Sequence, residues 1–133
     1  MKPTQRSVLA LLDFSRAYDT VWRERLLMCM ADKGVPTPYI LWIRSFLENR
    51  QARVRVNNTL GKSYYLSQGL PQGSVIAPLL FLFYIDNLAS LLPKNVIAAM
   101  FADDVAFVGT HCSQVEAAKL VQAAVNVVHA WSH

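Results

Sequence analysis

The chain has 133 residues, of which 53% are hydrophobic and 17% are charged. That length suits one domain, and the apolar content excludes intrinsic disorder. The formal net charge of +4 at pH 7 is compatible with a polyanionic partner, while Cys29 and Cys112 show no spacing typical of a disulfide framework or a zinc site. We therefore expect an intracellular globular protein, and we leave nucleus or cytoplasm open.

The N-terminal part of the chain predicts a strand followed by a helix. Ser7–Phe14 is short and apolar and carries Asp13 near its end, which is typical of a strand that stops at a polar residue. Trp22–Lys33 has apolar residues at helical spacing, and Gly34 stops that helix.

A second helix and a pair of strands follow. The helix is expected to start at Thr37 as its cap, with Pro38 in the first turn. Ala52–Val56 alternates apolar and charged residues, and Ser63–Leu66 returns as its partner strand. The alternation predicts one apolar and one basic face, with Val54 and Val56 on the first and Arg53 and Arg55 on the second.

A glycine-bearing loop over Gln68–Gly73 leads into the most apolar segment of the chain, Val75–Leu92. That segment approaches the roughly 17–20 residues of a membrane span. Asp86 inside it and Pro78 near its start argue against a membrane, because an acid is costly there. We expect a buried core helix, since such helices are apolar nearly all round.

Two apolar arms flank the adjacent acids Asp103 and Asp104, which predicts a β-hairpin with both acids at its turn. The arms are Ile97–Ala102 and Val105–Thr110. Neighbouring carboxylates repel, and a divalent cation is the simplest group to offset that repulsion; a solvated acidic turn explains the isolated pair equally well. Beyond the hairpin, Ser113 and Glu116 form a capping box that starts the last helix.

Asp13 is a candidate third ligand beside Asp103 and Asp104, since a strand ending in an acid can lie next to the acidic hairpin. Carboxylate oxygens suit Mg²⁺ or Mn²⁺ rather than zinc or copper. Two such ions can activate a 3′-hydroxyl and stabilise a leaving pyrophosphate in phosphoryl transfer. For Asp13 alone, a cap on the segment after the strand remains the simpler interpretation.

Tyr18 and the loop around Gln72 are candidates for nucleotide contacts. A ring a few residues after a metal-binding acid, as Tyr18 follows Asp13, could pack beneath a nucleotide sugar and leave no room for a ribose 2′-hydroxyl. A core aromatic is the alternative. In the loop, Gly69 and Gly73 permit close backbone approach to a ligand, and Gln72 offers amide donors and acceptors.

In order and character, these segments resemble reverse transcriptases, and more narrowly the palm of non-LTR, LINE-type retrotransposon polymerases. The resemblance rests on Leu12–Asp19, Gly69–Ser74 with Pro78, and Phe101–Asp104. It implies an RNA-directed DNA polymerase that acts on an RNA template, a DNA primer and deoxynucleotides, away from membranes. Viral RNA-dependent RNA polymerases typically carry an acid at the position of Tyr18, and Gly where Ala102 stands, so DNA synthesis is preferred.

The resemblance also implies a role for each candidate residue. Two Mg²⁺ or Mn²⁺ ions would be held by Asp13, Asp103, Asp104 and the backbone carbonyl of Phe14. Tyr18 would be the steric gate that favours deoxynucleotides, and Gln72 with Gly73 would lie against the incoming nucleotide and the template base. Arg53 and Arg55 would contact the template or primer backbone, although a solvated outer face is commoner for such charges.

By the same resemblance we expect an α+β fold, a partial polymerase palm with part of the fingers, in which helices pack on one face of an antiparallel sheet. Residues 1–133 are expected to form a single partial reverse transcriptase domain without the N-terminal fingers, the thumb or an endonuclease. The missing fingers and thumb of a larger polyprotein would be its partners, and the chain alone would be inactive. The alternative is a non-catalytic retrotransposon remnant that folds, or binds RNA, without polymerising.

Overall fold

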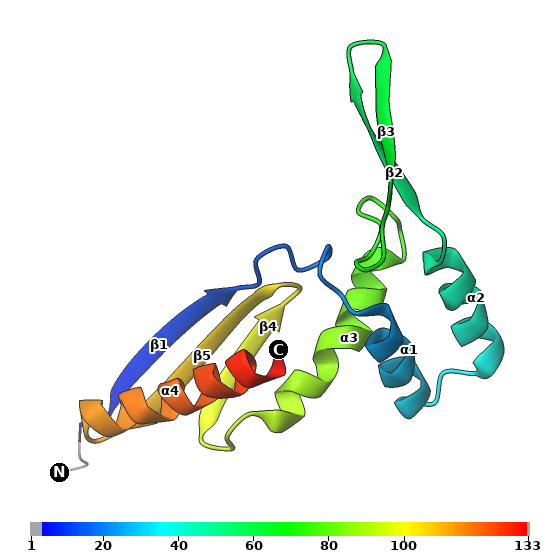
Figure 1. Cartoon of the computed structure of the whole chain (residues 1–133). Helices are drawn as coiled ribbons and strands as arrows, with labels where there is room; N and C mark the ends of the chain where they lie inside the picture. Colours follow the sequence, from blue (N-terminus) through cyan, green and yellow to red (C-terminus); the bar gives the residue numbers. More distant parts are fainter. Residues whose placement is uncertain (1–3, 133) are drawn as a thin grey trace. The chain divides into compact units, whose positions relative to one another are not determined.

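The computed structural model describes residues 4–132, which form four helices and five strands (Figure 1). In chain order these elements are β1 (Arg6–Asp13), α1 (Arg23–Asp32), α2 (Thr37–Leu47), β2 (Gln51–Val56), β3 (Thr59–Tyr65), α3 (Ala77–Leu91), β4 (Val96–Phe101), β5 (Asp104–His111) and α4 (Gln114–Trp131). All strand pairs are antiparallel, so the predicted α+β class is confirmed. The chain divides into two compact units: one contains the residues up to Ser15 and from Ile85 onward, and the other contains Arg16–Tyr84.

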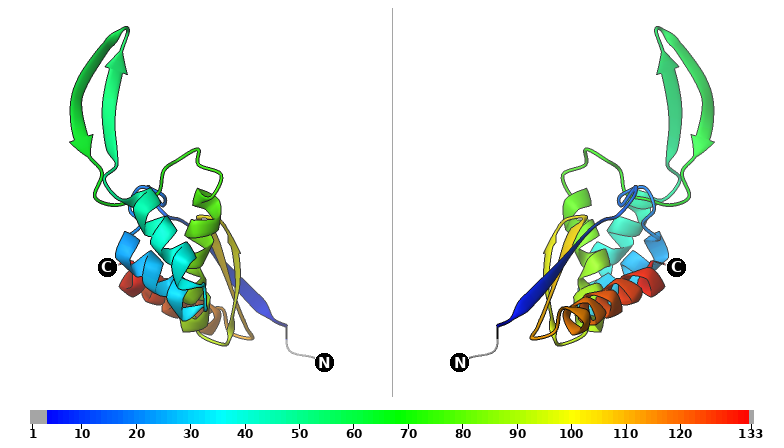
Figure 2. Two further views of the ribbon diagram at one scale, coloured as in Figure 1. Left: turned by 90° about the vertical axis from the view of Figure 1, so that its right-hand side faces the viewer. Right: turned by 90° about the vertical axis from the view of Figure 1, so that its left-hand side faces the viewer.

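The first unit is a three-stranded sheet in the order β1-β5-β4, and α4 packs on one of its faces, as Figure 2 shows. Val105 and Phe107 of the central strand β5 are buried on that side. At Gly109 an added Cβ would lie 2.7 Å from the Ala117 carbonyl oxygen and 3.0 Å from Cγ2 of Val121. Glycine at this position therefore lets α4 approach the sheet closely.

The opposite face of this sheet is apolar and exposed. Four of its large side chains are more than half exposed: Leu9, Leu11, Ile97 and Phe101. Successive side chains of a strand point to opposite faces, so Asp13 lies on this open face, in the same alternation as the leucines of β1. The first predicted ligand thus stands on the side of the sheet away from α4.

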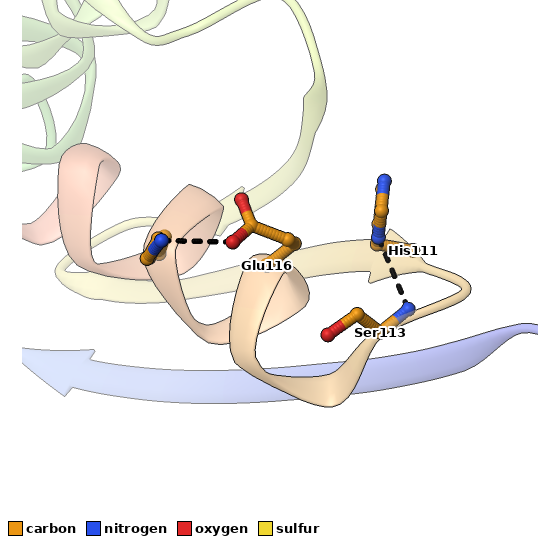
Figure 3. Close-up of polar contacts among 4 residues, drawn as sticks. His111, Ser113 and Glu116 are labelled. Atoms are coloured by element: carbon orange, nitrogen blue, oxygen red, sulfur yellow. Dashed lines mark hydrogen bonds and ion pairs between the residues drawn. The ribbon is translucent and has the colours of Figure 1, made fainter.

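The N-terminus of α4 lacks the predicted capping box. Ser113 is the N-cap residue, but its side chain makes no capping hydrogen bond. Its backbone N–H donates instead to Nδ1 of His111 at 3.1 Å, and Glu116 accepts from Nζ of Lys119 at 2.8 Å (Figure 3). That hydrogen bond lowers the pKa of Glu116. The predicted box is wrong because both of its partners are engaged elsewhere: the Ser113 N–H by His111, and the Glu116 carboxylate by Lys119.

The second unit packs α1 against α2 and extends a hairpin, β2–β3, beyond them (Figure 1). Leu26, Leu27 and Met30 bury one side of α1, as the spacing predicts. The start of α2 differs by one residue from the prediction. Pro36 is the N-cap residue, Thr37 already takes the first helical position, and no side chain caps this helix.

Every residue of the β2–β3 ribbon is exposed. The sequence predicts one apolar and one basic face, and the apolar side chains Val54 and Val56 are 62% and 64% exposed. A register shift between Arg53 and Arg55 also interrupts the regular alternation of the strand. Both strands of the ribbon are therefore present as predicted, but β3 begins at Thr59, four residues before the expected start at Ser63.

Helix α3 is buried along one side only, whereas its apolar sequence predicts a buried core helix. Its buried side consists of Ala77, Leu80, Phe81, Ile85 and Leu88. Leu79, Leu82 and Leu91 are each more than half exposed. Among the helices that the structure describes, none is long and apolar enough to cross a membrane.

Candidate active site

Asp13 and Asp104 face each other across two paired strands. Asp13 is the last residue of β1, Asp104 is the first residue of β5, and the antiparallel register pairs them directly. Directly opposed residues in such a pair have Cβ atoms roughly 4.5–5.5 Å apart. Both side chains are exposed. The fold therefore brings together two predicted ligands that lie far apart in the sequence.

The acidic hairpin turns one residue earlier than the sequence predicts. Phe101 pairs with Asp104, so the turn consists of Ala102 and Asp103, and only one of the two acids stands at the tip. Ala102 has a φ of +52°, a left-handed conformation that costs a residue with a Cβ roughly 1–2 kcal/mol. Backbone strain of this kind gathers at functional sites, and here it lies directly before the paired acids.

The donor set of this hairpin consists of carboxylate oxygens, which suit Mg²⁺ or Mn²⁺. Within residues 4–132, however, no group of three or more His, Cys, Asp or Glu side chains lies close enough together to hold a metal ion. The strand register joins Asp13 to Asp104, while Asp103 stands in the turn. The donors fit such an ion by their chemistry, and the three-carboxylate site stays a prediction.

Phe14, whose backbone carbonyl is a predicted ligand, is held by α4. Its ring meets that of Trp131 edge to face, with the ring centroids 5.8 Å apart. The indole N–H of Trp131 donates to Oδ1 of Asn87 at 2.9 Å. These contacts restrain the backbone immediately after Asp13.

Tyr18 lies in the second unit and is half-buried. Its ring stacks on that of Phe81, with 4.9 Å between centroids and 23° between the ring planes. The side chain is therefore fixed by packing without being fully enclosed, which suits both a core aromatic and a sugar gate. Because Tyr18, Gln72 and Gly73 belong to the second unit, their proximity to the acids of the first stays a prediction.

Gln72 and Gly73 are exposed in the loop before α3. The side-chain amide of Gln72 donates to Oδ1 of Asp19 at 3.0 Å. Gly73 has a φ of +79°, and a Cβ added there would meet nothing within 4 Å. Gly69 has a φ of +81°, and its added Cβ would lie 2.5 Å from the carbonyl oxygen of Asp19. Gly69 thus allows the loop to touch the segment that carries Tyr18, whereas Gly73 borders open space.

A cavity of about 580 Å³ borders this loop. Its walls carry charges and amides, from Asp19, Arg23, Arg50, Gln68 and Gln72. The volume falls within the roughly 300–1,000 Å³ of small-molecule sites. The exposed side of Gln72 therefore has space for a ligand.

Arg23 is not marked as a functional residue by the sequence pattern. It is buried at the start of α1 and donates to three backbone carbonyls of the segment that leads into the Gln72 loop. Burial lowers the pKa of its guanidinium, the charge of Arg50 lowers it further, and Glu24 opposes both effects. The one available signal was its spacing, because Arg23 stands three and four residues before Leu26 and Leu27 on the apolar side of the helix.

Arg53 and Arg55 are exposed on the ribbon, in a segment that holds no acid. Residues 49–85 contain four of the 13 lysines and arginines and none of the nine acids, so the rest of the chain carries nine of each. Arg55 is partly engaged, because Nη2 donates to Oδ1 of Asn58 at 3.0 Å. The whole net positive charge of the chain is therefore concentrated on and beside the ribbon.

The whole chain, residues 1–133, matches the family described as reverse transcriptase (RNA-dependent DNA polymerase). It is 32% identical over 127 residues to the probable RNA-directed DNA polymerase from transposon BS of Drosophila melanogaster, which covers 90% of this chain and 14% of that protein. The probable RNA-directed DNA polymerase from transposon X-element of the same species is 36% identical over 98 residues, or 71% of this chain and 11% of the relative.

A third relative is the RNA-directed DNA polymerase from mobile element jockey of Drosophila melanogaster. It is 29% identical over 138 residues, which covers 99% of this chain and 15% of the relative. The chain therefore spans between 11% and 15% of the length of these three proteins.

Proposed function

The chain belongs to the reverse transcriptase family, and on that premise we propose that it forms the palm-centred part, with part of the fingers, of a LINE-type RNA-directed DNA polymerase. The observation that carries the proposal is the direct pairing of Asp13 with Asp104 at one end of the β1-β5-β4 sheet. The full polymerase would extend a DNA primer with deoxynucleotides on an RNA template.

The acids and one carbonyl form the proposed metal site. Two Mg²⁺ or Mn²⁺ ions would be held by Asp13, Asp103, Asp104 and the backbone carbonyl of Phe14. When bound, such ions activate the primer 3′-hydroxyl and stabilise the leaving pyrophosphate. The chain itself contributes placement: the strand register aligns Asp13 with Asp104, and the contact with Trp131 restrains Phe14.

Primer extension by the full-length protein on an RNA template with Mg²⁺ tests this assignment. D103N and D104N should each lower extension by roughly a thousandfold, because a catalytic metal contributes several kcal/mol to transition-state stabilisation. D32N, which removes an exposed acid from α1, is the matched control and should extend normally. Unchanged extension by D103N and D104N would show that the metal assignment is wrong.

The same assay addresses the size of the active unit. We expect no processive synthesis by residues 1–133 alone, and robust extension by the purified chain would contradict this expectation. A full-length protein that binds RNA but extends no primer would instead favour the non-catalytic remnant.

Tyr18 is the proposed sugar gate, and Gln72 with Gly73 would face the incoming nucleotide and the template base. Y18A should raise incorporation of ribonucleotides relative to deoxynucleotides, because the ring would no longer exclude the 2′-hydroxyl. Y18F keeps the ring that stacks on Phe81 and is the matched control. Equal sugar discrimination in Y18A and Y18F would remove Tyr18 from this role.

Arg53 and Arg55 are proposed to contact the template or primer backbone, and the charge distribution supports this proposal. The double variant R53Q/R55Q should weaken binding of the full-length protein to a template–primer duplex. The slope of the logarithm of the affinity against the logarithm of the salt concentration should also become shallower, by roughly one for each lost phosphate contact. K94Q removes an exposed cation outside the basic segment and should leave the slope unchanged. An unchanged slope in R53Q/R55Q would mean that these arginines face solvent only.

A further inference from the structure

Arg23 joins the two segments of the second unit to which the proposed function assigns nucleotide contacts. Its Nε donates to the carbonyl oxygen of Gly69 at 2.9 Å. Its Nη2 and Nη1 donate to the backbone carbonyl oxygens of Gln68 at 2.9 Å and of Leu66 at 2.8 Å. We propose that Arg23 is a positioning residue, which holds the loop of Gln72 against the segment of Tyr18 and thereby sets sugar discrimination.

Backbone contacts place the two segments directly against each other. The N–H of Gly69 donates to the carbonyl of Val21 at 2.8 Å, and the N–H of Leu70 donates to the carbonyl of Tyr18 at 2.7 Å. There is no room for a side chain at Gly69, where an added Cβ would lie 2.5 Å from the Asp19 carbonyl oxygen. A shift of the loop therefore moves the backbone of the proposed gate residue itself.

Arginine is the side chain that suits this position. Its planar guanidinium presents five donors in a fixed fork and stays charged when buried. Three carbonyl oxygens from one short stretch, residues 66–69, converge on that fork. A lysine keeps the charge, but its single ammonium group cannot reproduce the planar geometry, and the buried carbonyl of Gly69 or the partly buried carbonyls of Leu66 and Gln68 would lose a partner.

The positioning role of Arg23 rests on the proposed function, because it affects sugar discrimination only if Tyr18 and Gln72 contact a nucleotide. Gln72 lies at the exposed end of the loop, and its hydrogen bond to Asp19 also joins the loop to the segment that carries Tyr18. Arg23 holds the buried end of the same loop. Loosening the buried end should alter the choice of substrate, beyond lowering the amount of folded enzyme.

Single-nucleotide insertion by the full-length polymerase is the main test. In R23K, the ratio of kcat/KM for a deoxynucleotide to that for the matching ribonucleotide should fall about tenfold, since one or more hydrogen bonds to a charged group are lost. R44K replaces an exposed arginine on α2 and should keep the ratio within about twofold of the wild type, the precision we ask of the assay. A purely structural role would lower kcat for both sugars by the same factor and leave the ratio and KM unchanged. That outcome overturns the proposal.

Amide hydrogen exchange on the wild-type protein provides a second test that does not require activity or a folded R23K variant. The amides of Gly69 and Leu70 should exchange at least about tenfold more slowly than those of the exposed ribbon. Equal rates would show that the loop is not clamped, which also overturns the proposal. Failure of the proposed function is recognised separately, because the wild-type polymerase would then extend no primer.

Discussion

Replacing Asp104 by asparagine tests whether the paired strands hold two like charges together. Asp13 and Asp104 are direct partners in an antiparallel pair, with about 5 Å expected between their Cβ atoms. Two unit charges at that distance in water repel by roughly 0.8 kcal/mol, and directly opposed like charges destabilise a sheet by roughly 0.2–1 kcal/mol. D104N should therefore stabilise the metal-free chain by up to about 1 kcal/mol and raise its melting temperature by a few degrees.

Thermal unfolding in EDTA and in Mg²⁺ separates repulsion from metal binding. The stability gain of D104N over the wild type should become smaller as the salt concentration rises from about 0.01 M to about 1 M, because the Debye length falls from roughly 30 Å to 3 Å. Mg²⁺ at about 100 times its Kd should stabilise the wild type by about 2.7 kcal/mol but D104N by much less. D32N should respond to Mg²⁺ as the wild type does. This reasoning is refuted if D104N has a lower melting temperature than the wild type in EDTA at low salt, or if Mg²⁺ stabilises D104N as much as it stabilises the wild type.

Three further substitutions test the packing of the first unit. A102G should raise stability by less than about 1 kcal/mol, because glycine relieves the left-handed strain but loses more entropy on folding; a lower melting temperature would contradict the turn geometry. G109A should lower stability by about 1–3 kcal/mol in urea, since its Cβ would press on the Ala117 carbonyl oxygen; wild-type stability would mean that α4 is not seated there. W131F should cost about 0.5–1.5 kcal/mol through the lost hydrogen bond to Asn87, and an unchanged melting temperature would argue against that bond.

Local patterns in the sequence predict nearly every element of the fold, because hydrophobic spacing and turn residues act within a few positions. The helix around Leu26 and the arms beside Asp103 follow from such patterns. The pairing of Asp13 with Asp104 does not, because it depends on which strands become neighbours in the sheet. A resemblance to a known family supplied that link, and the register supports it.

Arg23 and the ribbon show why the remainder could not be predicted. A charged residue at a helix start is normally solvated, and nothing near Arg23 in the sequence reveals the three carbonyls that receive its hydrogen bonds from residues 66–69. The alternation at Val54 and Val56 is typical of a half-buried strand, but burial depends on a covering layer that a short window of sequence does not contain.

The uneven distribution of charge also governs how the chain behaves in concentrated solution. Residues outside 49–85 carry equal numbers of cations and acids, so replacing the four cations inside that range would bring the formal net charge from +4 to zero. Proteins near zero net charge tend to associate and precipitate. The ribbon adds open strand edges and exposed apolar side chains such as Tyr65, which favour edge-to-edge pairing unless charges prevent it. Arg53 and Arg55, which are proposed to contact nucleic acid, supply two of these four charges, so R53Q/R55Q should lose solubility together with binding.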